Sequence, residues 1–419
     1  MSIYRLALAS LANRRNTVLL TIVAIALGVT LLLGVERLRG EARESFANTV
    51  SGVDLIIGAR GGSMQLLLYS VFRIGNASSE MSWKSYEKIA GDPKVAWALP
   101  FALGDSHKGF RVLGTSAAYF EHFRYGQKRN LRISAGKQFS ELFDAVLGAD
   151  VARELGYKVG TSFTITHGVG DAAFAEHDDK PFRVVGILAK TGTPVDRTIH
   201  VGLDGIVAIH IDWRGGARVP GLWITADEAR MMNLRPKTVT AVLIGLKSRR
   251  MAFKLLRQIN AYSPEPLTAI LPGVVLHELW RALGTVERAL TVVSILVVLT
   301  SLLGMIAMLL AGIDGRRREM AILRSIGAGP RHVFALLLLE ALILTALGIL
   351  LGLAFLYGAL AIARTSLESA IGLQISIGLP GTVEFGLLGL ILVAGIFAGV
   401  VPALRAYRHS LSDGMMVRQ

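Results

Sequence analysis

The sequence predicts an α-helical membrane protein with four transmembrane helices, in a 1+3 arrangement, and a large α+β extracytoplasmic domain between the first and second helices. Hydrophobic residues make up 52% of the 419-residue chain, which is too apolar for a soluble enzyme of this size. They gather in four long runs instead of spreading evenly along the chain. Between the first two runs lie roughly 240 residues of ordinary globular composition, enough to bury a core of their own.

The first apolar run, residues 17–35, follows a basic segment of residues 1–16. About 18 residues at 1.5 Å per residue reach about 27 Å, just enough to cross the hydrocarbon core of a bilayer. A cleaved signal peptide is the alternative, but the run is long for one and no small-residue cleavage site follows it. The charged residues 36–50 favour a helix that leaves the membrane as a stalk.

The other three spans are expected at residues 289–313, 333–359 and 382–401.

The basic residues of the short loops orient these spans. They cluster in residues 1–16, in the loop of residues 314–332 and in the tail of residues 402–419, whereas the loop of residues 360–381 carries only Arg364. Since cytoplasmic loops are enriched in Lys and Arg, both termini are predicted to be cytoplasmic and the large domain external. The net charge of +14 comes largely from such flanks, and without an RNA- or DNA-binding motif it does not indicate a nucleic-acid partner.

The external segment is predicted to fold as an α+β domain, residues 51–274, carried on stalk helices of residues 36–50 and 275–288. Seven stretches rich in β-branched and aromatic residues indicate strands, and residues 82–90 and 249–261 indicate helices. The chain contains no cysteine, so disulfides and thiol chemistry are excluded. The predicted strands lie at residues 54–59, 94–103, 110–114, 162–166, 182–188, 206–211 and 239–246.

The most distinctive stretch is the loop of residues 314–332, which begins DGRRREMAILRSIGAGP. Its three arginines would lie among lipid headgroups on the cytoplasmic side. Apolar residues then recur at helical spacing, and glycines followed by a proline end one helix and open the next. A plain polar loop is one interpretation; a surface helix that docks into a cytoplasmic partner is the other. The predicted contact residues are Arg316, Arg317, Arg318, Glu319, Met320, Ile322, Leu323, Ser325, Ile326 and Gly327.

The run RRREMAILRSIGA, followed by a long apolar helix, resembles the signature of FtsX-like permeases, the membrane subunits of MacB/LolC/FtsX-group (type VII) ABC systems. Residues 5–34 resemble the first helix of that family, and the tail VVPALRAYRHS resembles its ending, although a proline common later in that tail is replaced near Ser410. The resemblance implies a MacB-like external domain whose membrane-proximal part is interrupted by an inserted β-rich lobe, at about residues 119–219.

The resemblance also implies partners and a mode of action. It implies a bacterial inner (cell) membrane location and two permease subunits, identical or paralogous, on a cytoplasmic ABC ATPase dimer. ATP-driven closure of the ATPases would do mechanical work outside the membrane, on a lipoprotein, a peptide or a drug-like substrate. A non-transporting regulator of a periplasmic enzyme, such as a cell-wall hydrolase, and a metal-handling or sensing assembly remain as alternatives.

The chain offers no catalytic or cofactor site of its own. No P-loop motif is present, so ATP and Mg²⁺ are expected in a partner chain, and the protein is predicted not to be an enzyme. His177, Asp178 and Asp179, in one Gly-rich hairpin with His167, are weak candidates for metal ligands, and a solvated hairpin tip is the favoured interpretation. Other histidines, including His200 and His210, are expected to be packed rather than ligating.

One carboxylate, Glu340, falls inside the third predicted span. An ionised group at that depth is expensive, so we expect it to face the helix bundle and bond a neighbouring helix, with a coupling role as the alternative. Two small-residue pairs, Gly348 with Gly352 and Gly395 with Gly399, suit close packing between membrane helices.

Overall fold

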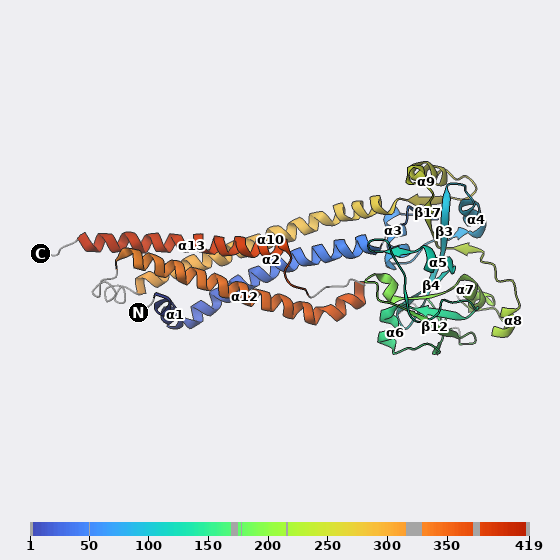
Figure 1. Cartoon of the computed structure of the whole chain (residues 1–419), viewed down its shortest axis with the longest axis horizontal. Coiled ribbons are helices and arrows are strands. Elements are labelled where there is room, and N and C mark those ends of the chain that lie inside the picture. Colours follow the sequence, from blue (N-terminus) through green and yellow to red (C-terminus); the bar gives the residue numbers. More distant parts are fainter. Residues whose placement is uncertain are drawn as a thin grey trace. The chain divides into compact units, whose positions relative to one another are not determined.

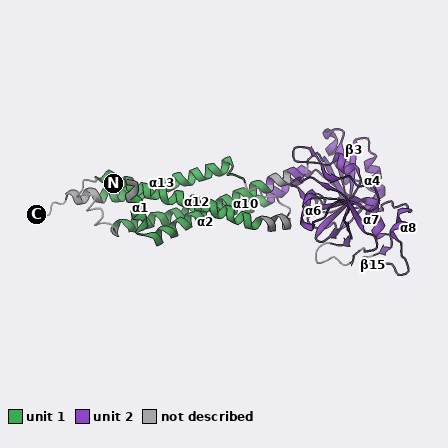
Figure 2. Cartoon of the chain, turned by 60° about the horizontal axis from the view of Figure 1, so that its bottom comes forward, with its two compact units in different colours: residues 1–41, 283–366, 375–419 green, residues 42–282, 367–374 purple. Residues whose placement is uncertain are grey.

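The chain folds into two compact units, which Figure 2 shows in different colours. The computed structural model describes residues 3–49, 51–168, 175–176, 178–214, 217–315, 329–371 and 378–415. The helical unit comprises residues 1–41, 283–366 and 375–419, and the globular unit comprises residues 42–282 and 367–374.

Among the described residues, four helices are long and apolar enough to span a membrane. They are α2 (Arg15–Thr49), α10 (Pro272–Gly315), α12 (Pro330–Ile371) and α13 (Thr382–Met415), and Figure 1 shows all four. A short helix that the sequence analysis did not predict, α1 (Ile3–Ala12), precedes them. The globular unit lies in sequence between α2 and the first turns of α10, so the predicted 1+3 arrangement is confirmed.

The third and fourth membrane helices are longer than predicted. Helix α12 continues to Ile371, past the end expected at residue 359, because the chain has no glycine or proline between residue 359 and Gly372. Helix α13 likewise runs through Pro402 into the predicted tail.

Helices α2 and α12 approach each other closely at the first predicted glycine pair. A Cβ atom on Gly352 would lie 2.8 Å from the carbonyl oxygen of Ala26, and one on Gly348 would lie 2.5 Å from Cγ2 of Ile25. The hydroxyl of Thr30 donates a hydrogen bond of 2.9 Å to the carbonyl of Gly352. Small residues therefore let the two backbones pack without intervening side chains, as in other membrane helix pairs.

The second glycine pair packs α13 against α12 in the same way. A Cβ atom on Gly395 would lie 2.2 Å from Oγ1 of Thr345, and one on Gly399 would lie 2.5 Å from Cβ of Ala341. Both glycines of α13 therefore meet side chains on a single face of α12.

The globular unit is built on one large sheet, which counts 12 strands in the described residues. Along its main path, neighbours pair antiparallel except for the two parallel pairs β4–β13 and β8–β12. The order is β18 (Leu267–Ile270), β1 (Leu55–Ala59), β17 (Ala241–Leu246), β3 (Val95–His107), β4 (Phe110–Thr115), β13 (Thr198–Gly202), β8 (Asp144–Leu147), β12 (Phe182–Leu188) and β7 (Ile133–Gly136).

Strand β3 joins the two halves of this sheet. Its first part, from Val95 to Phe101, pairs with β17, and its later part, from Ala102 to His107, pairs with β4. A register shift between Leu103 and Ser106 bends the strand within its second half. Four strands from later in the sequence, β7, β8, β12 and β13, lie beyond β4, so the chain leaves the first half after β3 and returns to it with β17.

Short helices cover the sheet and enclose three apolar clusters. Helices α4 (Trp83–Ala90) and α9 (Ala252–Asn260) bury Ile89, Leu255 and Ile259 against β1, β17 and β18. Helices α6 (Ala149–Leu155) and α7 (Leu203–His210) pack in a second cluster around Phe143, Phe163 and Phe182.

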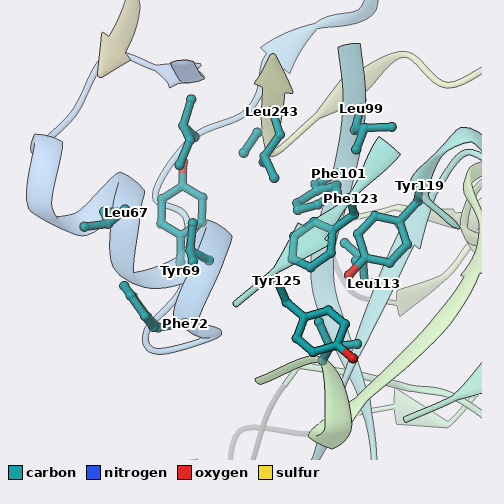
Figure 3. Packing of buried hydrophobic residues seen from close by; sticks show 14 of the residues in the cluster. Leu67, Tyr69, Phe72, Leu99, Phe101, Leu113, Tyr119, Phe123, Tyr125 and Leu243 are labelled. Atoms are coloured by element: carbon teal, nitrogen blue, oxygen red, sulfur yellow. The ribbon is translucent and has the colours of Figure 1, made fainter. Parts of the chain in front are cut away.

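The third cluster is rich in aromatic rings, and Figure 3 shows its packing. Tyr119 and Phe120 lie on α5 (Ala118–His122), and Phe123 follows that helix. The rings of Tyr119 and Phe123 stack with centroids 4.8 Å apart, and Phe101 of β3 meets Tyr119 edge-on at 5.8 Å. Such contacts add to the area that these rings bury.

One predicted strand is wrong. Residues 206–211 lie mainly in α7, because their β-branched run follows directly on strand β13, and Gly202 turns the chain into a helix whose faces are largely buried. Local β-propensity is overridden by this packing on the sheet. The expected strand at 162–166 is reduced to β9 (Ser162–Phe163), with β10 (Thr166–His167) following.

We predict that Gly352→Ala destabilises the helical unit, because the new methyl group meets the backbone oxygen of Ala26 and the Cβ of Val29, each at 2.8 Å. Overpacking of this kind costs about 1–3 kcal/mol. Gly358→Ala in the same helix is the matched control, since a Cβ there meets nothing within 4 Å; it should be neutral or stabilise by about 1 kcal/mol or less. Equal melting temperatures for the two variants in detergent would contradict the close packing.

Candidate functional site

The predicted coupling residues all fall within residues 316–328, outside the part of the chain that the structure describes. The elements that flank them are described. Ile313, near the end of α10, and Val333, near the start of α12, belong to one buried cluster, which also contains Ala403 and Ala406 of α13. At the same end of the helical unit, a guanidinium nitrogen of Arg14 donates to the carbonyl of Gly312 at 2.7 Å. The end of α10 and the start of α12 therefore pack beside the C-terminal part of α13, and the end of α10 also contacts the N-terminal part of the chain.

Glu340 lies fully buried on α12. The hydroxyl of Ser10 on α1 donates to its Oε1 atom at 2.6 Å, which ties the N-terminal helix to α12. A hydrogen bond to a carboxylate is stronger than one between neutral groups. The arrangement can anchor α1 within the helical unit, while a coupling role for Glu340 stays a prediction.

A second buried polar group in the helical unit, Arg37 of α2, was not predicted. Its guanidinium donates to the carbonyl of Gly378 at 2.7 Å and to the hydroxyl of Tyr357 at 3.2 Å. The Tyr357 hydroxyl in turn donates to Gly378 at 2.8 Å. The arginine thus ties α2 to α12 and to the residues before α13.

The predicted metal candidates do not come together as one site in the described residues. His177 lies outside the described residues, and Asp178 is exposed. Asp179 instead meets two cations, with the Lys180 ammonium at 2.7 Å and the Arg218 guanidinium at 2.8 Å. Burial raises the pKa of Asp179, but Lys180 and Arg218 outweigh that effect and lower it. A carboxylate neutralised in this way is a poor metal ligand.

Lys180 itself is fully buried, and its ammonium also donates to both carboxylate oxygens of Asp212, at 3.0 and 3.2 Å. Asp212 is fully buried as well. Arg218, which pairs with Asp179, also stacks on Trp223. Its guanidinium carbon lies 4.2 Å from the centroid of the Trp223 ring. Buried charges persist only when they are paired. These ion pairs therefore hold the residues around Lys180, just before β12, against the segment that follows α7.

The two histidines expected to be packed behave differently. His200 is buried in the aromatic cluster, stacked on Tyr119 at 5.2 Å, and burial lowers its pKa to about 3. It is therefore a neutral core residue, as predicted. His210, at the end of α7, instead faces the carboxylate of Asp105 and the imidazole of His167.

Among the described residues, Asp105, His167 and His210 form a group of side chains that could hold a metal ion. Nδ1 of His167 lies 3.0 Å from Oδ1 of Asp105 and 3.1 Å from Nε2 of His210. Burial alone would raise the pKa of Asp105, but its interactions with the two imidazoles hold that pKa well below its usual range. Burial would lower the pKa of His210, and Asp105 outweighs this effect and raises it.

Two family models match the chain. The FtsX-like permease C-terminal model matches residues 291–411, and the MacB-like periplasmic core domain model matches residues 18–248, more than half of the chain. The chain belongs to the family of MacB/FtsX-type ABC transporter permeases. The resemblance carried by the loop of residues 314–332 is thereby confirmed, since that loop lies inside the FtsX-like match.

No curated protein matches this permease. Among solved structures, the extracellular domain of the noncanonic ABC-type transporter YknZ from Gram-positive bacteria is similar to it. The two share 10% sequence identity with a TM-score of 0.31, over 52% of this chain and 98% of that one.

Two polar sites of the permease escaped the sequence analysis for different reasons. Arg37 was assigned to the charged stalk, although it lies two residues after the apolar run that ends at Val35. This position is the available signal for a side chain that turns back to bond the helices. Asp105 lies near the end of β3, where Asp105, Ser106 and His107 are buried in succession. It is far in sequence from His167 and His210, so no local pattern joins the three.

We predict that Ser10→Ala and Glu340→Leu each lower the melting temperature of the permease in detergent, whereas Glu340→Gln is tolerated. The amide of glutamine can still accept the hydrogen bond from Ser10, and leucine cannot. Loss of such a bond costs about 1–3 kcal/mol. A double variant, Ser10→Ala with Glu340→Leu, should be no worse than Glu340→Leu alone. Fully additive losses would show that the two residues act independently.

We also predict that Asp212→Ala destabilises the globular unit strongly, because it removes a fully buried partner of the fully buried Lys180. Breaking a buried ion pair from one side costs about 3–5 kcal/mol. The control is Asp227→Ala, which removes an exposed partner of Arg230 within α8 (Ala226–Arg230) and should cost about 1 kcal/mol or less. Thermal unfolding of the full-length protein measures both, and a similar loss in the two variants would contradict the assignment.

Proposed function

We propose that this permease couples ATP hydrolysis by a separate cytoplasmic ATPase to mechanical work by its extracytoplasmic globular unit. The observation that carries the proposal is the continuity of two helices. Helix α2 has 35 residues and α10 has 44, and each contains a membrane span together with residues of the globular unit. At 1.5 Å per residue they reach about 52 and 66 Å, well beyond the roughly 30 Å of a bilayer core. Rigid elements of this kind carry displacement between distant sites.

The strands that adjoin these helices support the same mechanism. Strand β1 begins a few residues after α2 ends, and α10 begins directly after β18. These two strands are neighbours in the sheet, paired antiparallel from Ile56 with Ile270 to Ala59 with Leu267. Movement of either helix therefore acts on the same pair of strands.

Contacts within the helical unit also join α2 to α10. The hydroxyl of Ser301 donates to the carbonyl of Ala24 at 2.9 Å, and a Cβ on Gly28 would lie 3.2 Å from Cγ2 of Val298. Since the helices are linked here and again through β1 and β18, we propose that they act as one paired lever within each subunit. In this proposal, α2 and α10 of one subunit move relative to the second permease subunit, which is identical or paralogous.

The lining of the helical unit supports a function in which the globular unit acts on a substrate outside the membrane, and not one in which a substrate passes between the helices. A cavity of about 300 Å³ between α2, α10 and α13 is lined mainly by aliphatic side chains, among them Leu32, Leu302 and Ile391. Such a lining suits lipid chains and offers a polar substrate few hydrogen bonds. We therefore propose export or extraction of a lipoprotein, peptide or drug-like molecule held by the globular unit. In the alternative function, the same movement of the globular unit would regulate a bound cell-wall hydrolase.

The ATPase is proposed to bind residues 316–328, with both termini of the permease on the cytoplasmic side of a bacterial inner membrane. Because the chain has no P-loop, ATP and Mg²⁺ would be bound by the partner. The apolar stripe of Met320, Ile322, Leu323 and Ile326 supplies what an amphipathic helix needs to lie in a groove of another protein.

We predict that Leu323→Asp and Ile326→Asp each release the ATPase while the permease still folds and inserts. Burial of such a side chain contributes about 1.5–3 kcal/mol, which corresponds to about a 10- to 100-fold loss of affinity. The experiment is co-purification with the ATPase and measurement of ATP turnover in the complex.

Leu379→Asp is the matched control, because Leu379 is 90% exposed in the segment before α13 and is predicted to lie on the external side. This variant should bind the ATPase normally. Normal binding and turnover by the Leu323→Asp and Ile326→Asp variants would refute the assignment of residues 316–328 as the coupling segment.

A further inference from the structure

We propose that Asp105, His167 and His210 form a binding site for one divalent transition-metal ion, for which Zn²⁺ is the best match. Imidazole and carboxylate are common ligands of Zn²⁺ in proteins, whereas Mg²⁺ and Ca²⁺ prefer oxygen ligands alone. This site lies within the globular unit and does not depend on the coupling mechanism proposed above.

The fold brings these residues together from three elements. Asp105 of β3 and His167 of β10 are direct partners in an antiparallel pair, so their side chains stand on the same face of the sheet. His210 is the last residue of α7, a helix that packs on β4 and β3. The three side chains are therefore positioned by regular structure and not by loops.

The distances between the three nearest atoms suit a metal ion. Oδ1 of Asp105, Nδ1 of His167 and Nε2 of His210 form a triangle with sides of 3.0, 3.1 and 3.5 Å. An ion with ligand distances of about 2.0–2.2 Å in tetrahedral geometry places its ligands about 3.3–3.6 Å apart. The triangle has a circumscribed radius of about 1.9 Å, so an ion just above its plane can reach all three atoms at ordinary Zn²⁺ distances.

The orientation of His210 is also that of a metal ligand. Its Nδ1 atom lies 2.8 Å from the carbonyl of Ile206 and donates to it, so that in the neutral imidazole Nε2 carries the lone pair, directed at Asp105 and His167. Metal-bound histidines almost always use their second nitrogen in this way.

Hydrogen bonding alone accounts for the cluster less completely. Nδ1 of His167 carries at most one hydrogen, yet it lies within hydrogen-bonding distance of both Oδ1 of Asp105 and Nε2 of His210. One hydrogen cannot serve both neighbours with good geometry. Hydrogen bonding alone therefore needs a protonated His210 whose Nε2 donates to Asp105, whereas a cation accepts lone pairs from all three atoms.

The site is open on one side. The Asp105 side chain is only 6% exposed, but those of His167 and His210 are 42% and 29% exposed. With three protein ligands, a Zn²⁺ ion would keep a further position for water or for a ligand atom of a client, as in sites that exchange ligands and unlike closed structural sites. A bound ion would also hold β10 and the end of α7 to β3.

The test is titration of ZnCl₂ into the untagged full-length permease in detergent, after removal of metal with a chelator. We expect one saturable site per chain with micromolar or tighter affinity, and an increase in melting temperature on Zn²⁺ addition. Millimolar Mg²⁺ or Ca²⁺ should not compete. His167→Ala and His210→Ala should each weaken binding by at least about tenfold, since loss of even an outer-shell partner costs 10- to 100-fold.

Two control variants locate the site. His122→Ala removes the last residue of α5, a histidine that stacks on Trp97 of β3. This variant should bind Zn²⁺ normally. His177→Ala should also bind normally; loss of binding in this variant, with normal binding by His167→Ala, would place the metal elsewhere in the hairpin and overturn the proposal. The absence of saturable binding in the wild-type protein would leave a hydrogen-bonded Asp–His–His cluster only, and would overturn it too.

X-ray absorption of the Zn²⁺-loaded wild-type protein keeps the proposal testable if a variant fails to fold. The expected first shell consists of nitrogen and oxygen atoms at about 2.0–2.1 Å, with the outer-shell signal of two imidazole rings. A first shell without imidazole would exclude this site.

Discussion

Strands β1 and β18 exchange backbone hydrogen bonds at the edge of the sheet, and the remaining organisation of the permease depends on this pairing. One strand follows the first membrane helix and the other precedes the second, so the pairing closes the globular unit at the two points where the chain enters and leaves it. Apart from this pairing, α2 and α10 are joined by contacts in the helical unit and by the guanidinium of Arg43 over the ring of Trp280. With the pairing, the displacement proposed above for the helices would act on adjacent strands of a single sheet.

Strand β3 extends this constraint to the second half of the sheet. Its 13 residues are shared between β17 on one side and β4 on the other, so one continuous backbone links the two halves of the sheet. In the proposed mechanism, movement at β1 would reach the later strands through β3. Asp105 lies within the register shift of β3, between Leu103 and Ser106, where β10 also pairs with the strand. A metal ion at that position would stiffen the part of β3 that pairs with β4 and β10.

The sequence was sufficient for the large features and insufficient for those that depend on contacts between distant residues. Four apolar runs of membrane-spanning length admit few alternatives, because an unsatisfied backbone in lipid is too costly for any other structure. The short strands β8, β13 and β18 carry four or five residues each, too few for a periodic pattern, and α7 resembled a strand because its burial on the sheet selects β-branched residues. The Asp105 cluster could not be found locally, since its members lie on three elements and only strand pairing makes Asp105 and His167 neighbours.

The buried polar groups of the helical unit show why its helices should move together. Ser10 with Glu340 ties α1 to α12, and Arg37 with Tyr357 ties α2 to α12. Between these bonds, Gly348 and Gly352 bring the two backbones so close that one helix cannot slide along the other without a steric clash. Because apolar packing in lipid gives little directional resistance to sliding, these polar bonds and close contacts are what would let a push on the loop between α10 and α12 displace α2 as well. In the proposed mechanism, the lever that acts on β1 and β18 would therefore include α12.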